Sequence, residues 1–411
     1  AMSKREYRLR NDLAPAAPPR GRIVGLDLHP DIFTVSLLAG RSAREARVIA
    51  RHKDLPVAEM EAWAKQHLRA GDLVLMEAGT GSFEVVRRLE SLGLSALVLE
   101  SAQTGRVADA YLDDDTIASE RIARSYLTGL AKVVWVPDPL TSERRELLHA
   151  HLKATEAETR AINELRGYLT QFQIRPGTRD LNHAQTREWV VVQREWSPLQ
   201  RTLLTQHFER LAFATMQSEV LYAAICQEVL SDQAMAGCLR VLGIGPVNAF
   251  AAGAVIGDIG RFTSPEKLVN YLGLHPGRKQ SGTGKLLQPG VGNRGRKEMR
   301  CLLVQAAQAV MRQKAGSSDL RDWGWRLFLR KGNRNVAVAA VARRLAEQLW
   351  HLLRGGCVTK PEQKRSLALK LSRMIRRIGA EARAALGLPK KTGDCVAVLM
   401  ERIDHPRAIT I

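Results

Sequence analysis

The first third of the chain alternates short apolar runs with amphipathic stretches, a pattern typical of an α/β domain. Apolar runs bounded by turn residues predict six strands, at residues 22–28, 32–39, 46–50, 73–77, 96–99 and 132–136. Helical periodicity predicts helices at residues 56–68, 83–92 and 114–127. Three strands, a helix and then alternating strands and helices are the order of an RNase H-like domain. Periodicity alone, however, establishes only the α/β class.

The middle of the chain has the pattern of long charged helices. Residues 142–172 and 199–233 contain few Gly or Pro and many paired charges, and a break at 176–179 separates them. Two such helices predict a coiled-coil-like hairpin, and an ordinary helical insertion fits the pattern equally well. Under either interpretation the segment separates two functional parts of the chain, the α/β part before it and the part that follows it.

The last part of the chain is predicted to be mainly α-helical. Helices are expected at 300–311 and 336–353, and the sequence LGIGP precedes an apolar helix within residues 239–259. We therefore expect an α/β plus α architecture with five parts: a flexible leader at 1–20, an RNase H-like domain at 21–140, a helical spacer at 141–235, a helical domain at 236–356 and a basic helical C-terminal element at 357–411.

Composition adds a strong charge imbalance to this picture. The 62 Lys and Arg residues exceed the 42 Asp and Glu residues, which gives a formal net charge of +20. The excess is not confined to one tail. It therefore indicates a polyanionic partner, of which nucleic acid is the commonest, with a merely basic surface as the alternative.

The cysteines and the apolar runs exclude other classes of protein. The five cysteines are scattered and form no C-x-x-C pair, which argues against a disulfide framework or a cysteine zinc site and fits a reducing cytoplasm. No run approaches the roughly 18 apolar residues of a membrane span, and the N-terminus lacks the apolar core of a signal peptide. We therefore expect a cytoplasmic protein with no membrane partner.

Two carboxylates are predicted at the ends of strands. Asp27 ends the first strand and Glu77 the fourth, so that neighbouring strands would present both at one rim of the sheet. Together with acids from a later helix, they would hold a pair of Mg²⁺ or Mn²⁺ ions, which prefer hard oxygen ligands. The alternative is that these acids are ordinary turn residues.

The later helix offers acids at its start. Asp113, Asp114 and Asp115 stand in the sequence LDDDTIASERIA, where helix capping is a serious alternative to metal binding. A second carboxylate three residues on would share the helix face. The residue three after Asp115 is Ala118, which carries no oxygen.

A serine in the third part of the chain is a candidate nucleophile. Ser281 lies between Gln and Gly, directly after Arg278 and Lys279, whose charges would hold a phosphate. Most loop serines only make a local hydrogen bond, and on the residues alone that interpretation is preferred.

The surrounding segment is basic and rich in glycine. A phosphate-contacting role is expected for the cations of residues 278–300, with a solvated basic loop as the alternative; these are Arg278, Lys279, Lys285, Arg294, Arg296, Lys297 and Arg300. Gly243 and Gly245 of LGIGP are similar to the hairpin of helix-hairpin-helix motifs, whose backbone amides grip phosphates. Trp323 and Trp325 are candidates for base stacking, although core packing is the preferred interpretation.

Together these segments resemble the DEDD transposases of bacterial insertion sequences, insertion-sequence family one-ten, which include the Piv-type DNA invertases. The resemblance covers roughly residues 20–355 and rests on ordered motifs: VGLDLH, LMEAGT, the acidic helix ending in ERIARSYLTG, GIGPVNA, GDIGRF, YLGLHPGRKQSG, GNRG followed by KEMR, and NVAVAAVARRL.

The resemblance implies a RuvC-like N-terminal domain, a spacer and a transposase domain. Asp27, Glu77 and Asp115 match the family's first three acids, and Ser281 matches its nucleophile. It further implies a bridge-type non-coding RNA that pairs with donor and target DNA, and dimers that assemble into a tetramer in which the metal site of one subunit completes the serine site of another. Strand exchange would proceed through a phosphoserine linkage, in a protein associated with the nucleoid.

The chain departs from the family at Ala118, where the fourth acid is expected. Asp114 could serve instead, the natural protein could differ, or the aspartate could have been replaced deliberately. We favour the last, because Ala1 before Met2 suggests a handled sequence. Two other functions remain open: a metal-dependent DNA junction nuclease without a covalent intermediate, and a non-catalytic nucleic-acid-binding scaffold.

Overall fold

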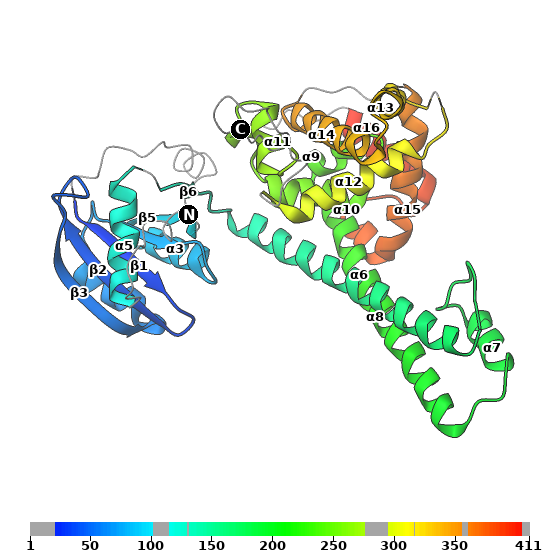
Figure 1. The fold of residues 1–411 in the computed structure, drawn as a ribbon. Helices are drawn as coiled ribbons and strands as arrows, with labels where there is room; N and C mark the ends of the chain where they lie inside the picture. The colour runs from blue at the N-terminus through cyan, green and yellow to red at the C-terminus, as the bar shows by residue number, and fades with distance from the viewer. Residues whose placement is uncertain are drawn as a thin grey trace. The chain divides into compact units, whose positions relative to one another are not determined.

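The computed structural model describes residues 21–101, 115–129, 131–275, 295–315, 317–355 and 361–404, without the side chains of residues 115, 116, 361 and 362. The chain divides into two compact units, Ala1–Asp138 and Pro139–Ile411 (Figure 1). The first unit is built on a mixed sheet and the described part of the second is mainly helical, so the α/β plus α class is confirmed at this level. The finer division into five parts stays a prediction.

The first unit contains a six-stranded sheet in the order β3-β2-β1-β4-β5-β6. Its strands are β1 Ile23–Leu28, β2 Ile32–Ala39, β3 Arg47–Pro56, β4 Leu73–Glu77, β5 Ser95–Leu99 and β6 Val133–Val134. β1 pairs antiparallel with β2 and parallel with β4, and β5 pairs parallel with β4 and antiparallel with β6. The central strands are buried, as their continuous apolar sequences predict.

Helices cover both faces of this sheet. They are η1 Val57–Glu59, α2 Met60–His67, α3 Ser82–Ser91 and α5 Asp115–Leu127. The cluster that includes Val24, Leu26 and residues of α2 and α3 fills one face, and a second cluster, with Ile23 and residues of α5, fills the other. Alternate residues of β1 therefore face opposite layers.

The largest differences from the predicted boundaries lie between residues 50 and 60. The third strand, expected at 46–50, continues to Pro56, and the helix expected from residue 56 begins with η1 and α2 instead. The reason is that β3 is an edge strand of the sheet. Its residues largely alternate between partly buried and exposed positions, and its length follows its pairing with β2, which reaches from Ala39 to Ile32.

The second unit begins with a long helical hairpin. α6 Pro139–Gln171 and α8 Pro198–Ser231 lie side by side, and α7 Ala184–Val192 lies at the tip (Figure 1). A separate apolar cluster, with Leu165, Leu169 and Trp196, holds the distal half of the hairpin together. The two predicted helices are confirmed, and α7 was not predicted.

The remaining helices share one large core with the proximal half of the hairpin. They are α9 Gln233–Cys238, α10 Pro246–Ala251, the π-helix η3 Ala252–Ile256, η4 Ile259–Arg261, α11 Pro265–Tyr271, α12 Lys297–Met311, α13 Asp319–Lys331, α14 Arg334–Leu353, α15 Pro361–Ala385 and α16 Thr392–Asp404. This core extends from Leu148 to Ile403, so the described C-terminal helices are part of the body of the unit. No described helix is long and apolar enough to cross a membrane.

Candidate active site and nucleic-acid interface

The structure brings Asp27 and Glu77 to the same edge of the sheet. β1 and β4 are parallel and in register up to the pair Leu26 and Met76, and Asp27 and Glu77 are the next residues on each strand. Matched positions of neighbouring strands point to the same face. The juxtaposition predicted from the strand ends is therefore present, with both residues half-buried.

The face that carries the two acids is the one covered by α5. Ile23 and Leu73, which have the same parity along their strands as Asp27 and Glu77, pack with Ile122 of α5. The helix comes unusually close because β1 has Gly25 at the crossing. A Cβ built at this position would lie 1.8 Å from the carbonyl oxygen of Ser119. Sequence reasoning missed this residue, although a glycine inside a strand often marks a close approach.

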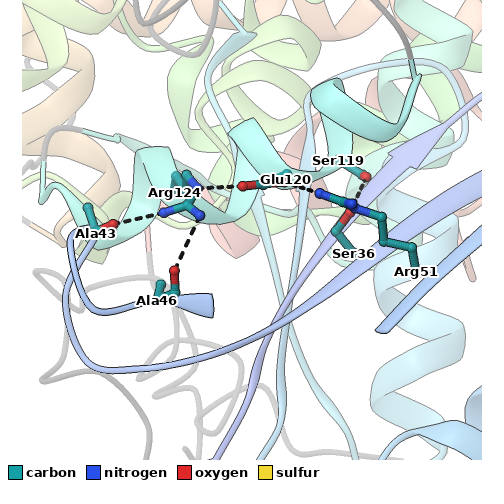
Figure 2. Close-up of polar contacts among 7 residues, drawn as sticks. All are labelled: Ser36, Ala43, Ala46, Arg51, Ser119, Glu120 and Arg124. Atoms are coloured by element: carbon teal, nitrogen blue, oxygen red, sulfur yellow. Dashed lines mark hydrogen bonds and ion pairs between the residues drawn. The ribbon is translucent and has the colours of Figure 1, made fainter. Parts of the chain in front are cut away.

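Polar contacts fix α5 along the sheet (Figure 2). The hydroxyl groups of Ser36 and Ser119 lie 2.8 Å apart and are buried. Arg51 and Arg124 both donate to the carboxylate of Glu120, at 2.6 and 2.7 Å. Burial raises the pKa of Glu120, but the hydrogen bonds from the two arginines outweigh it and the pKa is lowered. The carboxylate therefore stays charged and clamps the helix to β3.

These contacts also define the direction of α5. Arg124 donates to the carbonyl oxygens of Ala43 and Ala46, in the turn that follows β2 (Figure 2). The end of β2 pairs with the beginning of β1, whereas Asp27 lies at the other end of β1. The N-terminal end of α5 consequently points toward the edge with the two acids.

Asp115 and Ala118 lie at that N-terminal end. Asp115 is the first residue of α5 and precedes Ser119, which faces the sheet, by one turn. Ala118 precedes Ile122 by one turn and is half-buried. The backbone thus places both positions on the sheet-facing side of α5. Asp113, Asp114 and the side chain of Asp115 lie outside the described residues.

The acids at this edge are suited to a hard metal ion. Asp27 has a carboxylate oxygen 3.5 Å from Nε2 of His29, whose side chain is 45% exposed. Among the described side chains, no three His, Cys, Asp or Glu residues form a group able to hold a metal. Asp27 and Glu77 are two of the four expected carboxylate positions, and the other two fall on residue 115, whose side chain is not described, and on Ala118.

Ser281 lies outside the described residues, together with Arg278, Lys279, Lys285 and Arg294. The described residues on either side meet each other. The backbone N–H of Arg296 donates to the carbonyl oxygen of Tyr271 at 3.1 Å. A Cβ built on Gly295 would lie 2.6 Å from the backbone nitrogen of Gly273. The end of α11 and the start of α12 therefore meet at the two ends of residues 276–294, which contain Ser281 and are named the serine-bearing segment.

Three of the predicted phosphate-contacting cations begin α12. Arg296 is the N-cap residue and pairs with Glu298 at 2.7 Å, and Lys297 and Arg300 follow in the first turn. No side chain caps this helix by a hydrogen bond. Cations placed beside an uncapped helix N-terminus are suited to a phosphate group.

The GIGP turn connects α9 and α10. Gly243 has a φ of 81°, and a Cβ there would lie 2.7 Å from a methyl carbon of Val310 and 2.9 Å from the carbonyl oxygen of Ala306. Gly243 is thus required for packing against α12, which the sequence did not reveal. Gly245 is the N-cap residue of α10 and meets no such restriction.

The two tryptophans proposed as base-stacking candidates are partly buried on α13. Both pack against the main core. The indole N–H of Trp325 donates to the carbonyl oxygen of Met311 at 2.9 Å, and Arg344 lies over the ring of Trp323. This arrangement agrees with the preferred interpretation, core packing.

Comparison with known proteins shows similarity to transposases. Residues 239–321, which include the GIGP turn and Ser281, match the model of the transposase IS116/IS110/IS902 family. The chain is therefore similar to transposases of this family over these residues. Its curated relatives include a putative transposase of Sinorhizobium fredii, 27% identical over 68% of this chain and 74% of the relative.

Two further relatives are similar over most of their length. A probable family 20 transposase of Pseudomonas aeruginosa is 26% identical over 80% of this chain and 96% of the relative. The transposase for insertion sequence element IS1328 of Yersinia enterocolitica is 27% identical over 70% of this chain and 85% of the relative. The similarity therefore extends well beyond the segment that the family model matches.

Proposed function

We propose that the chain is the RNA-guided recombinase of an insertion sequence and cuts and rejoins DNA through a phosphoserine intermediate. The observation that carries the proposal is the family match across residues 239–321, the segment that contains Ser281. A net charge of +20 suits a protein that holds donor DNA, target DNA and a bridge-type RNA together.

In the proposed reaction, the hydroxyl group of Ser281 loses its proton and its oxygen bonds to the phosphorus of a DNA phosphodiester. The bond from phosphorus to one deoxyribose oxygen breaks, and that oxygen takes up a proton. A deoxyribose hydroxyl group of the exchanged strand then attacks the phosphoserine and releases the serine. Because each step replaces one phosphate ester with another, rejoining needs no external energy source.

The acidic edge of the first unit supports a second element of the proposal, an RNase H-like domain with a metal site. Asp27 and Glu77 would hold Mg²⁺ or Mn²⁺ with Asp115 or Asp114. Such an ion stabilises the negative charge that develops in phosphoryl transfer. The contribution of this chain is to keep two carboxylates adjacent on a rigid sheet and to point α5 toward them.

Ala118 suggests that this polypeptide assembles on nucleic acid but cleaves poorly. Ala118 shares the sheet-facing side of α5 with Asp115, where a carboxylate would complete the expected set. A non-catalytic scaffold would likewise bind nucleic acid without cleaving it. The two explanations differ in what happens when a carboxylate is supplied.

An exposed apolar stripe supports self-association. Along the middle of α8, Phe213, Met216 and Val220 are 58%, 53% and 64% exposed and follow helical spacing. Large apolar residues gathered on one helix face mark an interaction surface. We propose that this stripe contributes to a dimer, two of which form the tetramer.

The decisive experiment mixes the protein with supercoiled donor and target DNA, Mg²⁺ and the RNA transcribed beside its gene, and looks for DNA attached to protein on a denaturing gel. The unaltered chain, Ala118→Asp, and Ala118→Asp combined with Ser281→Ala are compared. We expect an RNA-dependent adduct with Ala118→Asp that the added Ser281→Ala abolishes. Cleavage without an adduct, independent of Ser281, would instead establish a metal-dependent junction nuclease, and binding without cleavage in every variant a scaffold.

A further inference from the structure

Three arginines from distant parts of the second unit converge beside the ends of the serine-bearing segment. Arg145 comes from α6, Arg261 from η4 within the GDIGRF motif, and Arg296 from the start of α12. Arg145 and Arg261 both interact electrostatically with Tyr271 and with Arg296. These three residues form the arginine cluster.

Two of these guanidinium groups are held in place by the same stretch of backbone. Arg145 donates to the carbonyl oxygen of Ala254 at 2.9 Å, and Arg261 donates to that of Ile256 at 3.0 Å. Both also reach the carbonyl oxygen of Val255, at 3.4 Å each. The guanidinium of Arg261 lies 4.2 and 4.3 Å from the ring centroids of Phe262 and Tyr271. The cluster is therefore preorganised.

The charges in the cluster repel one another. Burial, reinforced by the nearby Arg296 and Arg261, lowers the pKa of Arg145 to about 10, even though Tyr271 and Glu298 raise it. The pKa of Arg261 is lowered as well, again first by burial. Two carboxylates that act on the cluster are Glu298, which pairs with Arg296, and Asp258, which caps η4. Despite these acids, the pKa values of Arg145 and Arg261 stay lowered.

A group that gathers positive charge in a partly buried, fixed arrangement gains from binding an anion. Arg296 adds a specific observation, because its Nε atom is buried and has no hydrogen-bond partner among the described residues. Guanidinium groups recognise phosphate oxygens through paired N–H donors, and a bound anion would also relieve their mutual repulsion. The uncapped N-terminus of α12 lies at Arg296 and contributes further attraction.

We propose that Arg145, Arg261 and Arg296 form a binding site for one phosphodiester group of the nucleic acid on which the protein acts. The inference rests on the proposed function only in taking nucleic acid as the ligand. It deepens that function, because the chain leaves α11 and returns to α12 at this cluster. The bound phosphate would therefore fix the strand at the base of the segment that carries Ser281.

The test measures the salt dependence of binding by fluorescence anisotropy, with a labelled DNA duplex and a labelled single-stranded RNA of equal length. The variants are Arg296→Gln and Arg145→Gln. Arg330→Gln, which removes an exposed charge on α13, is the matched control. For duplex DNA, losing one phosphate contact lowers the slope of log K against log salt by about 0.9. We expect that loss for both cluster variants and no comparable change for the control.

Each outcome has a defined meaning. A reduced slope with DNA alone assigns the site to a DNA phosphate, and with RNA alone to an RNA phosphate. Slopes for Arg296→Gln that equal those of the unaltered chain on both polymers would overturn the proposal, and so would an equal loss with Arg330→Gln. If Arg145→Gln unfolds, Arg296→Gln decides, because the side chain of Arg296 pairs with Glu298, two residues further along the chain. Failure of the phosphoserine reaction would instead show as a missing adduct with unchanged slopes, so the two can be told apart.

Discussion

At Gly25 a single hydrogen atom in place of a side chain allows α5 to cross β1. We predict that Gly25→Ala destabilises the protein by about 3 kcal/mol, because its Cβ would overlap the carbonyl oxygen of Ser119 and displace the helix. Urea unfolding of the full chain would measure this loss. Gly79→Ala is the control, since a Cβ at Gly79 has no neighbour within 4 Å and should change the stability by less than about 1 kcal/mol. Similar losses for both variants would contradict the close crossing.

Lys370 on α15 gives stability a particular pH dependence. Its ammonium group donates to the carbonyl oxygens of Leu239 and Val241, and burial lowers its pKa from 10.5 to about 8. Between these values the unfolded chain holds a proton that the folded chain has lost, so the contribution of Lys370 to stability rises with pH. Below about pH 8, Lys370 is protonated in both the folded and the unfolded chain, so its contribution to the unfolding free energy no longer changes with pH.

We therefore predict that Lys370→Met flattens the change in unfolding free energy between about pH 7.5 and about pH 9.5, by up to about 2 kcal/mol relative to the unaltered chain. Urea titrations at the two pH values would measure it. Lys390→Met, which removes an exposed lysine from the same region, should leave the slope unchanged. Parallel pH profiles for all three proteins would argue against a proton lost at Lys370.

Among the elements, α8 exposes several large apolar side chains that do not pack in the cores of this chain. If the stripe formed by Phe213, Met216 and Val220 pairs with a second copy, Phe213→Glu combined with Val220→Glu should place buried charge in the interface and yield monomers. Light scattering after size-exclusion chromatography would measure the mass. Leu329→Glu, at a residue 76% exposed on α13, is the control. A dimer that survives the double change would rule out this face.

The elements also show what sequence patterns can predict. β1, β2 and β4 were placed to within a residue because buried strands are continuous apolar runs. The polar edge strand β3 was cut short, since its extent depends on its partner β2. α13 was not predicted as a helix, and its two tryptophans, candidates for base stacking, pack on the core.

Of the candidate site, too, one part could be predicted from the sequence and another could not. Parallel strands end at one edge, so the closeness of Asp27 and Glu77 could be predicted from strand order alone. The arginine cluster could not, because Arg145, Arg261 and Arg296 are far apart along the chain. They meet through tertiary packing, of α6 against the π-helix and of the start of α12 against the end of α11. Whether Ser281 acts as a nucleophile stays a prediction.

At the scale of the whole molecule, each unit has its own apolar core. The acidic edge belongs to the first unit, and the serine-bearing segment and the arginine cluster to the second. The net charge of +20 comes from the second unit, because residues 1–138 contain 19 Lys and Arg against 19 Asp and Glu. Binding of nucleic acid by the second unit is therefore expected to weaken with salt.

The core of the second unit also bears on how the protein is synthesised. α16 contributes Cys395, Leu399 and Ile403 to the same core that begins at Leu148. The ribosome makes the chain from its N-terminus, so this core stays open until α16 has emerged. The first unit can fold long before that point. Translation therefore delays completion of the core that carries the serine-bearing segment until α16 has been synthesised, and a chain terminated before α16 would lack a closed core in this unit.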